Sequence, residues 1–221
     1  MNVFPALAPR SLYGAPPPAA PSEPEGIRLI GVTTHFMRDQ EVFGECEPAD
    51  HVYRVVRGAV RGFRVLSDGR RQICDFYLPG DIFGIERGAE HRITAEALTD
   101  TMLVVARRSA LGHEGDGAMA RSLWDLAMIE LRRCQDHTLT LGRRSAGERV
   151  AGFLVDMAER IGDGENVELP MSRQDIADFL GLTIETVSRT LTQLQIAGLI
   201  TLAGCRSIHL RKPRALAELC A

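Results

Sequence analysis

One segment carries polar side chains along one side and apolar side chains along the other, if residues 184–195 form a helix. Val187, Leu191 and Leu194 recur at helical spacing and are expected to face a core. The polar residues of the opposite side are Glu185, Thr186, Ser188, Arg189 and Gln193. Hydroxyl, carboxylate, guanidinium and amide groups can pair with base edges, and the major groove of DNA admits a helix. A helical hairpin of any all-α domain would show similar spacing, so the segment must be read with its neighbours.

A shorter helix is predicted just before this one. Ser172 can cap its start, and Asp175 stands where a carboxylate favours the exposed amides of a first helical turn. Gly181 then ends the helix, because glycine readily adopts the left-handed backbone that follows many helices. Thr183 can cap the second helix. The two helices and their tight turn predict a helix-turn-helix.

A β-hairpin is predicted after the second helix. Leu199–Leu202 can pair with Ser207–Leu210, and Val167–Leu169 predicts a short strand ahead of the helix pair. This order of elements is typical of a winged helix. The tip of the wing, with Cys205 and Arg206, would lie beside the phosphate backbone of bound DNA.

The chain ahead of these elements has a different pattern. Short alternating runs punctuated by glycine extend from Glu41 to Ala106, and they predict an antiparallel sandwich or roll. Helical periodicity then takes over in a long segment, Ala118–Leu141. Such a helix exposes more apolar surface than one small domain can cover, so a partner helix is expected.

The predicted fold class is therefore α+β: an N-terminal antiparallel β-roll, a long dimerisation helix and a C-terminal winged helix-turn-helix. The expected parts are a disordered proline- and alanine-rich tail over residues 1–26, the roll over 27–115, the long helix over 116–142 and the DNA-binding domain over 143–221.

Composition is ordinary for a soluble globular protein, with 45% hydrophobic and 25% charged residues among 221. The net charge of −3 means that any basic surface must be local. Five scattered cysteines without a C-x-x-C pair argue against a disulfide framework or a zinc ribbon.

No apolar run has membrane-spanning length, so we expect a cytoplasmic protein without a membrane partner. The histidines show no metal-ligand spacing and are expected at the surface: His35, His51, His91, His113, His137 and His209.

Three features resemble the cyclic-AMP receptor/FNR superfamily of bacterial transcription factors, over nearly everything after the tail. Leu78–Gly84 is similar to the strand and turn of that family's sensor roll. The long helix follows the roll, as the family's dimerisation helix does. Ser172–Ala177 together with Gly181–Arg189 closely matches the family's DNA-reading signature, a long and specific motif.

The resemblance implies roles for individual residues. Glu185, Ser188 and Arg189 are similar to the base-reading set of the FNR/FixK branch, and the implied target is an inverted repeat of TTGAT-like half-sites. The chemistry agrees, because the Arg189 guanidinium matches guanine O6 and N7 and the Glu185 carboxylate can accept from cytosine N4. The residues expected to contact DNA phosphates are Arg173, Gln174, Thr183, Thr186 and Arg206.

A palindromic site needs a two-fold protein, so a homodimer is expected. Met119, Leu123 and Leu126 of the long helix are favoured for its interface, although Leu123 and Leu126 could equally belong to an intramolecular core. The family resemblance also implies that the roll presents loops to RNA polymerase. It further implies that the chain is a transcription regulator, expected to act as an activator, rather than an enzyme.

The departures from the family concern the sensor. Arg92 matches the arginine of the cyclic-nucleotide branch, but Ile85 and Ile93 stand at its glutamate and serine positions, and a buried isoleucine cannot satisfy ribose hydroxyls or a phosphate. The iron–sulfur branch needs clustered N-terminal cysteines and a roll cysteine, and this chain has Val104 at the roll position. Gly84 and Glu86 occupy the positions of the haem-binding branch's ligands. No cofactor and no metal are therefore expected.

What remains resembles FixK-type members, which lack a recognised small-molecule site and control genes of microoxic respiration, denitrification or nitrogen fixation. Two alternatives stay open: a regulator gated by an unidentified small molecule or haem in the roll, and a cupin-type enzyme, which would need a His-x-His strand that is missing here. Oxidation of Cys205 or Cys134 could modulate DNA binding, and an inert thiol is the simpler reading of each.

Overall fold

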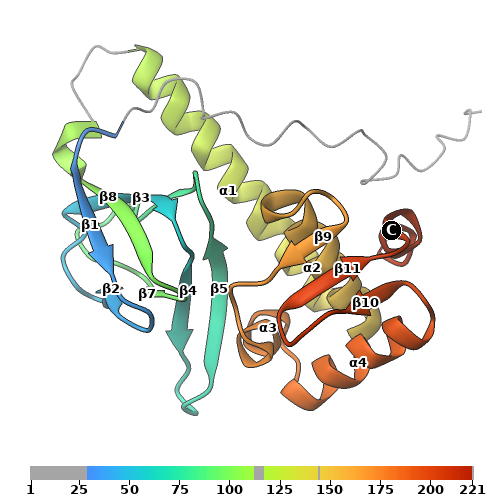
Figure 1. Ribbon diagram of the computed structural model, residues 1–221. Helices are drawn as coiled ribbons and strands as arrows, with labels where there is room; N and C mark the ends of the chain where they lie inside the picture. The colour runs from blue at the N-terminus through green and yellow to red at the C-terminus, as the bar shows by residue number, and fades with distance from the viewer. Residues whose placement is uncertain (1–28, 112–116, 144, 221) are drawn as a thin grey trace, which may run out of the picture.

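The computed structural model describes residues 29–111, 117–143 and 145–220, with the side chains of Ala110, Ala118, Met119 and Arg143 left out of the description. The expected tail over residues 1–26 lies outside the described residues. Within them, the strands of the N-terminal half form a roll, a long helix runs along one side of it, and a smaller helical domain follows (Figure 1). The α+β fold class predicted from the sequence is confirmed.

The roll consists of two antiparallel four-stranded sheets, with strand orders β1-β8-β3-β6 and β2-β7-β4-β5. Alternating apolar residues bury one face of each sheet, and aromatic side chains such as Phe43, Tyr53 and Phe83 fill the space between them. The strands are β1 (Val32–Phe36), β2 (Glu41–Phe43), β3 (His51–Arg57), β4 (Val60–Val65), β5 (Arg71–Tyr77), β6 (Ile82–Phe83), β7 (Thr94–Ala97) and β8 (Thr101–Arg107).

A 3₁₀ turn, η1 (Arg108–Leu111), ends the roll, and the long helix α1 (Gly117–Arg143) crosses from the roll to the C-terminal domain (Figure 1). One side of α1 packs on the roll, because Leu123 and Leu126 contact a buried cluster that includes Leu29, Val52 and Ile82. The other side leaves large apolar side chains in solvent: Trp124, Met128, Ile129, Leu131 and Leu139.

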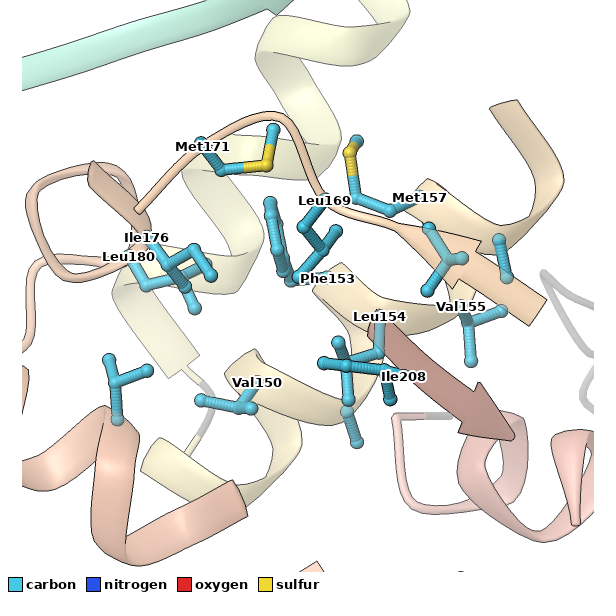
Figure 2. Close-up of a cluster of buried hydrophobic side chains, with 14 of the residues drawn as sticks. Val150, Phe153, Leu154, Val155, Met157, Leu169, Met171, Ile176, Leu180 and Ile208 are labelled. Atoms are coloured by element: carbon cyan, nitrogen blue, oxygen red, sulfur yellow. The ribbon is translucent and has the colours of Figure 1, made fainter. Parts of the chain in front are cut away.

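The C-terminal domain combines four helices with a three-stranded antiparallel sheet of order β10-β11-β9. Figure 2 shows Phe153 and Leu154 of one helix surrounded by Leu169, Ile176 and Ile208 from the neighbouring segments. The elements are α2 (Ala146–Ile161), β9 (Asn166–Glu168), α3 (Arg173–Leu180), α4 (Ile184–Ile196), β10 (Ile200–Leu202), β11 (Ser207–Leu210) and α5 (Pro213–Glu218).

The core of this domain continues into the roll. Ile73 and Phe76 of β5 belong to the same buried cluster as the apolar faces of α2, α3 and α4. At the junction the ring of Phe179 lies 5.1 Å from that of Phe76 and 5.9 Å from that of Phe153, measured between centroids. Roll and C-terminal domain therefore share apolar surface, which fixes α3 beside β5.

Candidate nucleic-acid interface

The start of α3 is stabilised by a reciprocal cap. Ser172 has extended backbone (φ −80°, ψ 166°), and its hydroxyl accepts a hydrogen bond from the amide of Asp175 at 3.1 Å. The Asp175 carboxylate accepts from the Ser172 amide at 2.9 Å. Both donors would otherwise be left without partners at the helix end, so this capping box fixes where α3 begins.

The turn between the helices follows from two residues. Gly181 adopts a left-handed backbone (φ +62°), a conformation that costs L-residues with a Cβ atom. Thr183 is the N-cap of α4, and its hydroxyl accepts from the amide of Thr186 at 3.2 Å. Each of these roles is the one predicted from the sequence.

Helix α4 has the two faces that the sequence predicts. Val187, Leu191 and Leu194 are buried against the domain core. Glu185 and Arg189 are exposed, and Ser188 between them is half-buried. A helix packed in this way holds its first two turns rigidly, and we call their polar side the reading surface. It carries a carboxylate, a hydroxyl and a guanidinium group, each of which can form hydrogen bonds with base edges.

The charges on that surface are set locally. A hydrogen bond from its own backbone amide lowers the pKa of Glu185, and the Thr183 hydroxyl and the nearby Arg189 charge lower it further. The carboxylate is therefore ionised near neutral pH and acts only as an acceptor, which suits a cytosine amino group. Arg189 remains an exposed cation one turn further along.

Residues expected to contact phosphates surround this surface. Arg173 opens α3 and reaches α4, because its Nη1 donates to Ser188 Oγ at 3.3 Å. Gln174 is exposed on the same turn and donates from Nε2 to Asp178 Oδ1 at 2.7 Å. Thr183 and Thr186 share a hydrogen bond between their hydroxyls at 3.0 Å at the start of α4. Arg206 lies on the β10–β11 hairpin, half-buried, beside the exposed Cys205.

The structure thus brings the residues expected to read bases close to those expected to contact phosphates on α3 and α4, through the contacts of Arg173 with Ser188 and of Thr183 with Thr186. It separates them from the residues expected at the dimer interface. Leu123 and Leu126 are half-buried against the roll, which is the intramolecular alternative, and the side chain of Met119 is not described. Cys134 is exposed on α1.

Sequence reasoning missed two roll residues that contact the helix-turn-helix. Arg61 of β4 and Arg71 of β5 both donate to the Asp175 carboxylate, and Arg71 also donates to Asp178. These pairs join residues more than 100 positions apart in the chain. No local pattern in the sequence signals such contacts.

The roll corrects two expectations about single residues. Both isoleucines were expected to be buried, but Ile85 is 45% exposed and Ile93 is half-buried. His91 is buried, with its ring stacked on that of Phe43 at 3.6 Å, whereas a surface position was expected. His113 lies outside the described residues.

A shallow cavity of about 360 Å³ lies on the roll beside His91. Its lining residues are Glu45, Cys46, Arg64, Gly88, Ala89, Glu90, His91 and Arg92. Within the described part of the chain, no group of three or more His, Cys, Asp or Glu side chains could hold a metal ion. In the same residues no helix is both long enough and apolar enough to cross a lipid bilayer.

Comparison with known proteins agrees with this architecture. Residues 33–113 match the model of the cyclic nucleotide-binding domain, and residues 148–219 match that of the Crp-like helix-turn-helix domain. The nitrogen fixation regulation protein FixK of Rhizobium meliloti (strain 1021) is 46% identical over 200 residues, which cover 90% of this chain and 91% of the relative. The chain belongs to the CRP/FNR family, in its FixK-like branch.

Two further relatives support this membership. FixK of Azorhizobium caulinodans is 48% identical over 200 residues, covering 87% of this chain and 81% of the relative. The solved structure of FixK2 from Bradyrhizobium japonicum superimposes with a TM-score of 0.84 at 49% identity, covering 87% of this chain and 98% of that one. This FixK-like chain is thus a DNA-binding transcription regulator rather than an enzyme.

Proposed function

We propose that the chain is a homodimeric transcription activator that reads an inverted repeat of TTGAT-like half-sites. Glu185, Ser188 and Arg189 of each subunit contact bases in the major groove. The observation that carries this proposal is the arrangement on α4, where Glu185 and Arg189 are exposed on a face whose back is fully buried. Arg189 suits guanine and ionised Glu185 suits the cytosine amino group, a combination found in a T-T-G-A-T half-site and its complement.

Contacts to phosphates supply affinity and register in this proposal. Arg173, Gln174, Thr183, Thr186 and Arg206 flank the reading face from α3, α4 and the hairpin. Arg173 is proposed to contact a phosphate and also donates a hydrogen bond to Ser188, one of the residues proposed to read bases. Such contacts fix the protein on the duplex without selecting a sequence.

The dimer interface is proposed on the exposed side of α1. Trp124, Met128 and Leu131 follow one another at i, i+4 and i+7 and so share a face of the helix, and Leu139 extends it. Exposed apolar stripes of this kind mark interaction surfaces. A second copy of the same helix is the occupant that the two-fold target requires, because each half-site needs its own α4.

The names of the relatives support the biological role. Two of them are nitrogen fixation regulation proteins, so we propose that the targets here are genes of nitrogen fixation, denitrification or microoxic respiration. In this proposal the protein acts in the cytoplasm, where its roll contacts RNA polymerase and recruits it to the promoter.

The decisive test is a titration of reduced, ligand-free protein onto a TTGAT-N4-ATCAA duplex, compared with a duplex in which the guanine is replaced. Wild-type protein should bind the first duplex tightly as a dimer. Arg189→Ala should lose about 1–3 kcal/mol of discrimination at the guanine, because the guanidinium fork reads that base.

Equal losses on the two duplexes would contradict the role of Arg189. Binding that requires an added small molecule would instead favour a regulator gated through the roll, for which the cavity beside Arg92 is the place to look.

A further inference from the structure

One carboxylate lies at the contact between the roll and the helix-turn-helix. Asp175 Oδ1 accepts hydrogen bonds from Arg61 Nη1 at 2.9 Å and from Arg71 Nη2 at 2.7 Å. Arg71 reaches further and donates from Nε to Asp178 Oδ2 at 2.9 Å. We call Arg61, Arg71, Asp175 and Asp178 the clamp. It joins strands β4 and β5 of the roll to α3, which lies beside β5 in Figure 1.

The second oxygen of the same carboxylate organises the start of α3. Asp175 Oδ2 accepts from the Ser172 amide at 2.9 Å and from the Ser172 hydroxyl at 2.6 Å. The side chain of Asp175 is only 4% exposed, and its two oxygens accept from Arg61, Arg71 and Ser172. The N3 residue of the α3 capping box, Asp175, is therefore also the residue that Arg61 and Arg71 of the roll contact.

We propose that Arg61 and Arg71 are positioning residues for DNA reading, which hold α3 and α4 in the orientation that binds DNA without the help of an effector. This inference rests on the proposed function, in which α3 and α4 contact the duplex.

The surroundings of the clamp restrict movement of α3. Gln72 Nε2 donates to the backbone carbonyl of Asp178 at 2.8 Å, and the ring of Phe179 packs near those of Phe76 and His137. Arg61 is itself fixed on the roll by an ion pair with Glu96 of β7. Charged hydrogen bonds are directional, so they add a defined orientation to an apolar contact that alone would permit sliding.

The clamp leaves the reading surface free. It engages the side of α3 that carries Asp175 and Asp178, whereas Glu185 and Arg189 of α4 are exposed. Gln174 of α3 is also exposed and donates from Nε2 to Asp178 Oδ1 at 2.7 Å, so the clamp meets the proposed phosphate-contacting residues at that position. The docked arrangement is thus compatible with DNA binding. In a protein whose binding-competent arrangement is only partly populated, the apparent Kd rises in inverse proportion to that population. In this proposal the four charged groups at the junction keep that population high without an effector.

The test is a charge exchange in the full-length chain, using Arg71→Glu, Asp178→Arg and the double variant. In the double variant the cation moves from β5 to α3, where it can pair with Glu at position 71 and with Asp175. Each single variant should raise the apparent Kd for the TTGAT duplex about tenfold, if the competent population falls to about one tenth. The double variant should recover most of that loss, which is a coupling between the two sites.

Asp178→Arg separates positioning from a direct effect of charge on DNA. If residue 178 acted only through its charge, replacing a carboxylate by a cation near the phosphates would tighten binding. The clamp predicts the opposite, because a third guanidinium would then face Arg61 and Arg71. Tighter binding by Asp178→Arg, or no recovery in the double variant, would overturn the proposal.

Arg70→Glu is the matched control for Arg71→Glu. Arg70 is the neighbouring residue, carries the same charge and pairs with Asp68 in the β4–β5 turn rather than with α3. A loss of binding by Arg70→Glu as large as that of Arg71→Glu would show a general electrostatic effect and contradict the clamp.

A measurement without DNA keeps the clamp testable if the proposed target sequence is wrong. Amide hydrogen exchange of free protein should be faster in residues 173–181 of Arg71→Glu than of wild type, and the double variant should restore protection. Unchanged exchange there would refute the clamp. Restored protection together with no binding of wild type to the TTGAT duplex would refute only the proposed target.

Discussion

At the scale of residues, the side chains of the proposed reading surface are positioned by hydrogen bonds to one another. Arg173 donates to Ser188, and Thr183 both caps α4 and contributes to the low pKa of Glu185. A residue proposed to contact phosphate therefore touches a residue proposed to contact a base. The two roles are still separable by experiment, since phosphate contacts act on every sequence and base contacts on one.

Arg173→Ala should weaken binding to specific and scrambled duplexes by similar factors. It should also reduce the slope of log K against log salt by about one, because one phosphate contact is lost. Fluorescence anisotropy over a salt series measures both quantities, with Arg189→Ala as the contrasting variant. A selective loss on the TTGAT duplex would show that Arg173 acts mainly through Ser188.

At the scale of elements, a group of ionisable side chains joins α1, α2 and the end of β5. Asp81, in the turn after β5, accepts from Arg133 of α1 at 3.0 Å and from Arg160 of α2 at 2.8 Å. Burial raises the pKa of Glu130 to about 7, and repulsion by Asp75 adds to the rise while Arg133 opposes it. Burial likewise raises the pKa of Asp75 to about 6.

These shifts give the folded state a pH dependence with a definite sign. Between pH 4.5, the ordinary pKa of a glutamate, and pH 7, the folded chain binds a proton at Glu130 more tightly than the unfolded chain does. The favourable contribution is complete below that window and is lost as the pH rises through 7. The Glu130 side chain is 45% exposed, so solvent screens part of this effect. Glu130→Gln should therefore raise Tm by only about 2 °C at pH 8 and leave it nearly unchanged at pH 5.

Thermal unfolding followed by circular dichroism at the two pH values tests this, at one protein concentration. The Glu130→Gln protein should retain a smaller slope from Asp75. An equal rise in Tm at both pH values would assign the effect to packing or to α1 itself rather than to titration.

Local patterns in the sequence predicted those elements whose causes are local. The cap at Ser172, the turn at Gly181 and the apolar spacing of α4 all lie within a few residues of one another, and each has its predicted role. Strand β1 (Val32–Phe36) was missed, because it lies at a sheet edge with mostly exposed side chains and shows no apolar alternation. The clamp was also missed, since its partners meet only after the roll and helices have packed.

The side of α1 that faces the roll illustrates the same limit. Leu123, Leu126 and the stripe containing Trp124 are all apolar positions of one helix, and the sequence alone does not say which of them the roll covers. The structure resolves this choice for the described side chains by packing Leu123 and Leu126 against the roll. Helix periodicity is thus predictable, but the rotation of the helix against its neighbour depends on tertiary packing.

At the scale of the whole molecule, α1 connects the roll to the C-terminal domain and carries the apolar stripe on which we propose the dimer interface. Leu131→Arg should convert the protein to a monomer, because a desolvated cation would face its copy across the two-fold axis. Sedimentation velocity measures the result, and binding to the full inverted repeat should fall with it.

Ile129→Arg is the matched control for that variant. Ile129 is 44% exposed and Leu131 is 48% exposed on the same helix, but Ile129 lies about 100° around the axis from Met128 and so outside the stripe. It should remain a dimer. Monomers from both variants, or from neither, would place the interface elsewhere.

If two chains pair through the apolar stripe on α1, as proposed, the amount of DNA-binding protein depends on the concentration of the chain itself. In the proposed dimer, no chain alone presents two reading helices at the spacing of an inverted repeat. While monomers predominate, mass action makes the dimer concentration grow with the square of the total chain concentration. The stability that each chain gains by association also rises with chain concentration. A modest rise in synthesis, or a modest rise in degradation, would then change occupancy of a promoter more than proportionally, without any ligand taking part.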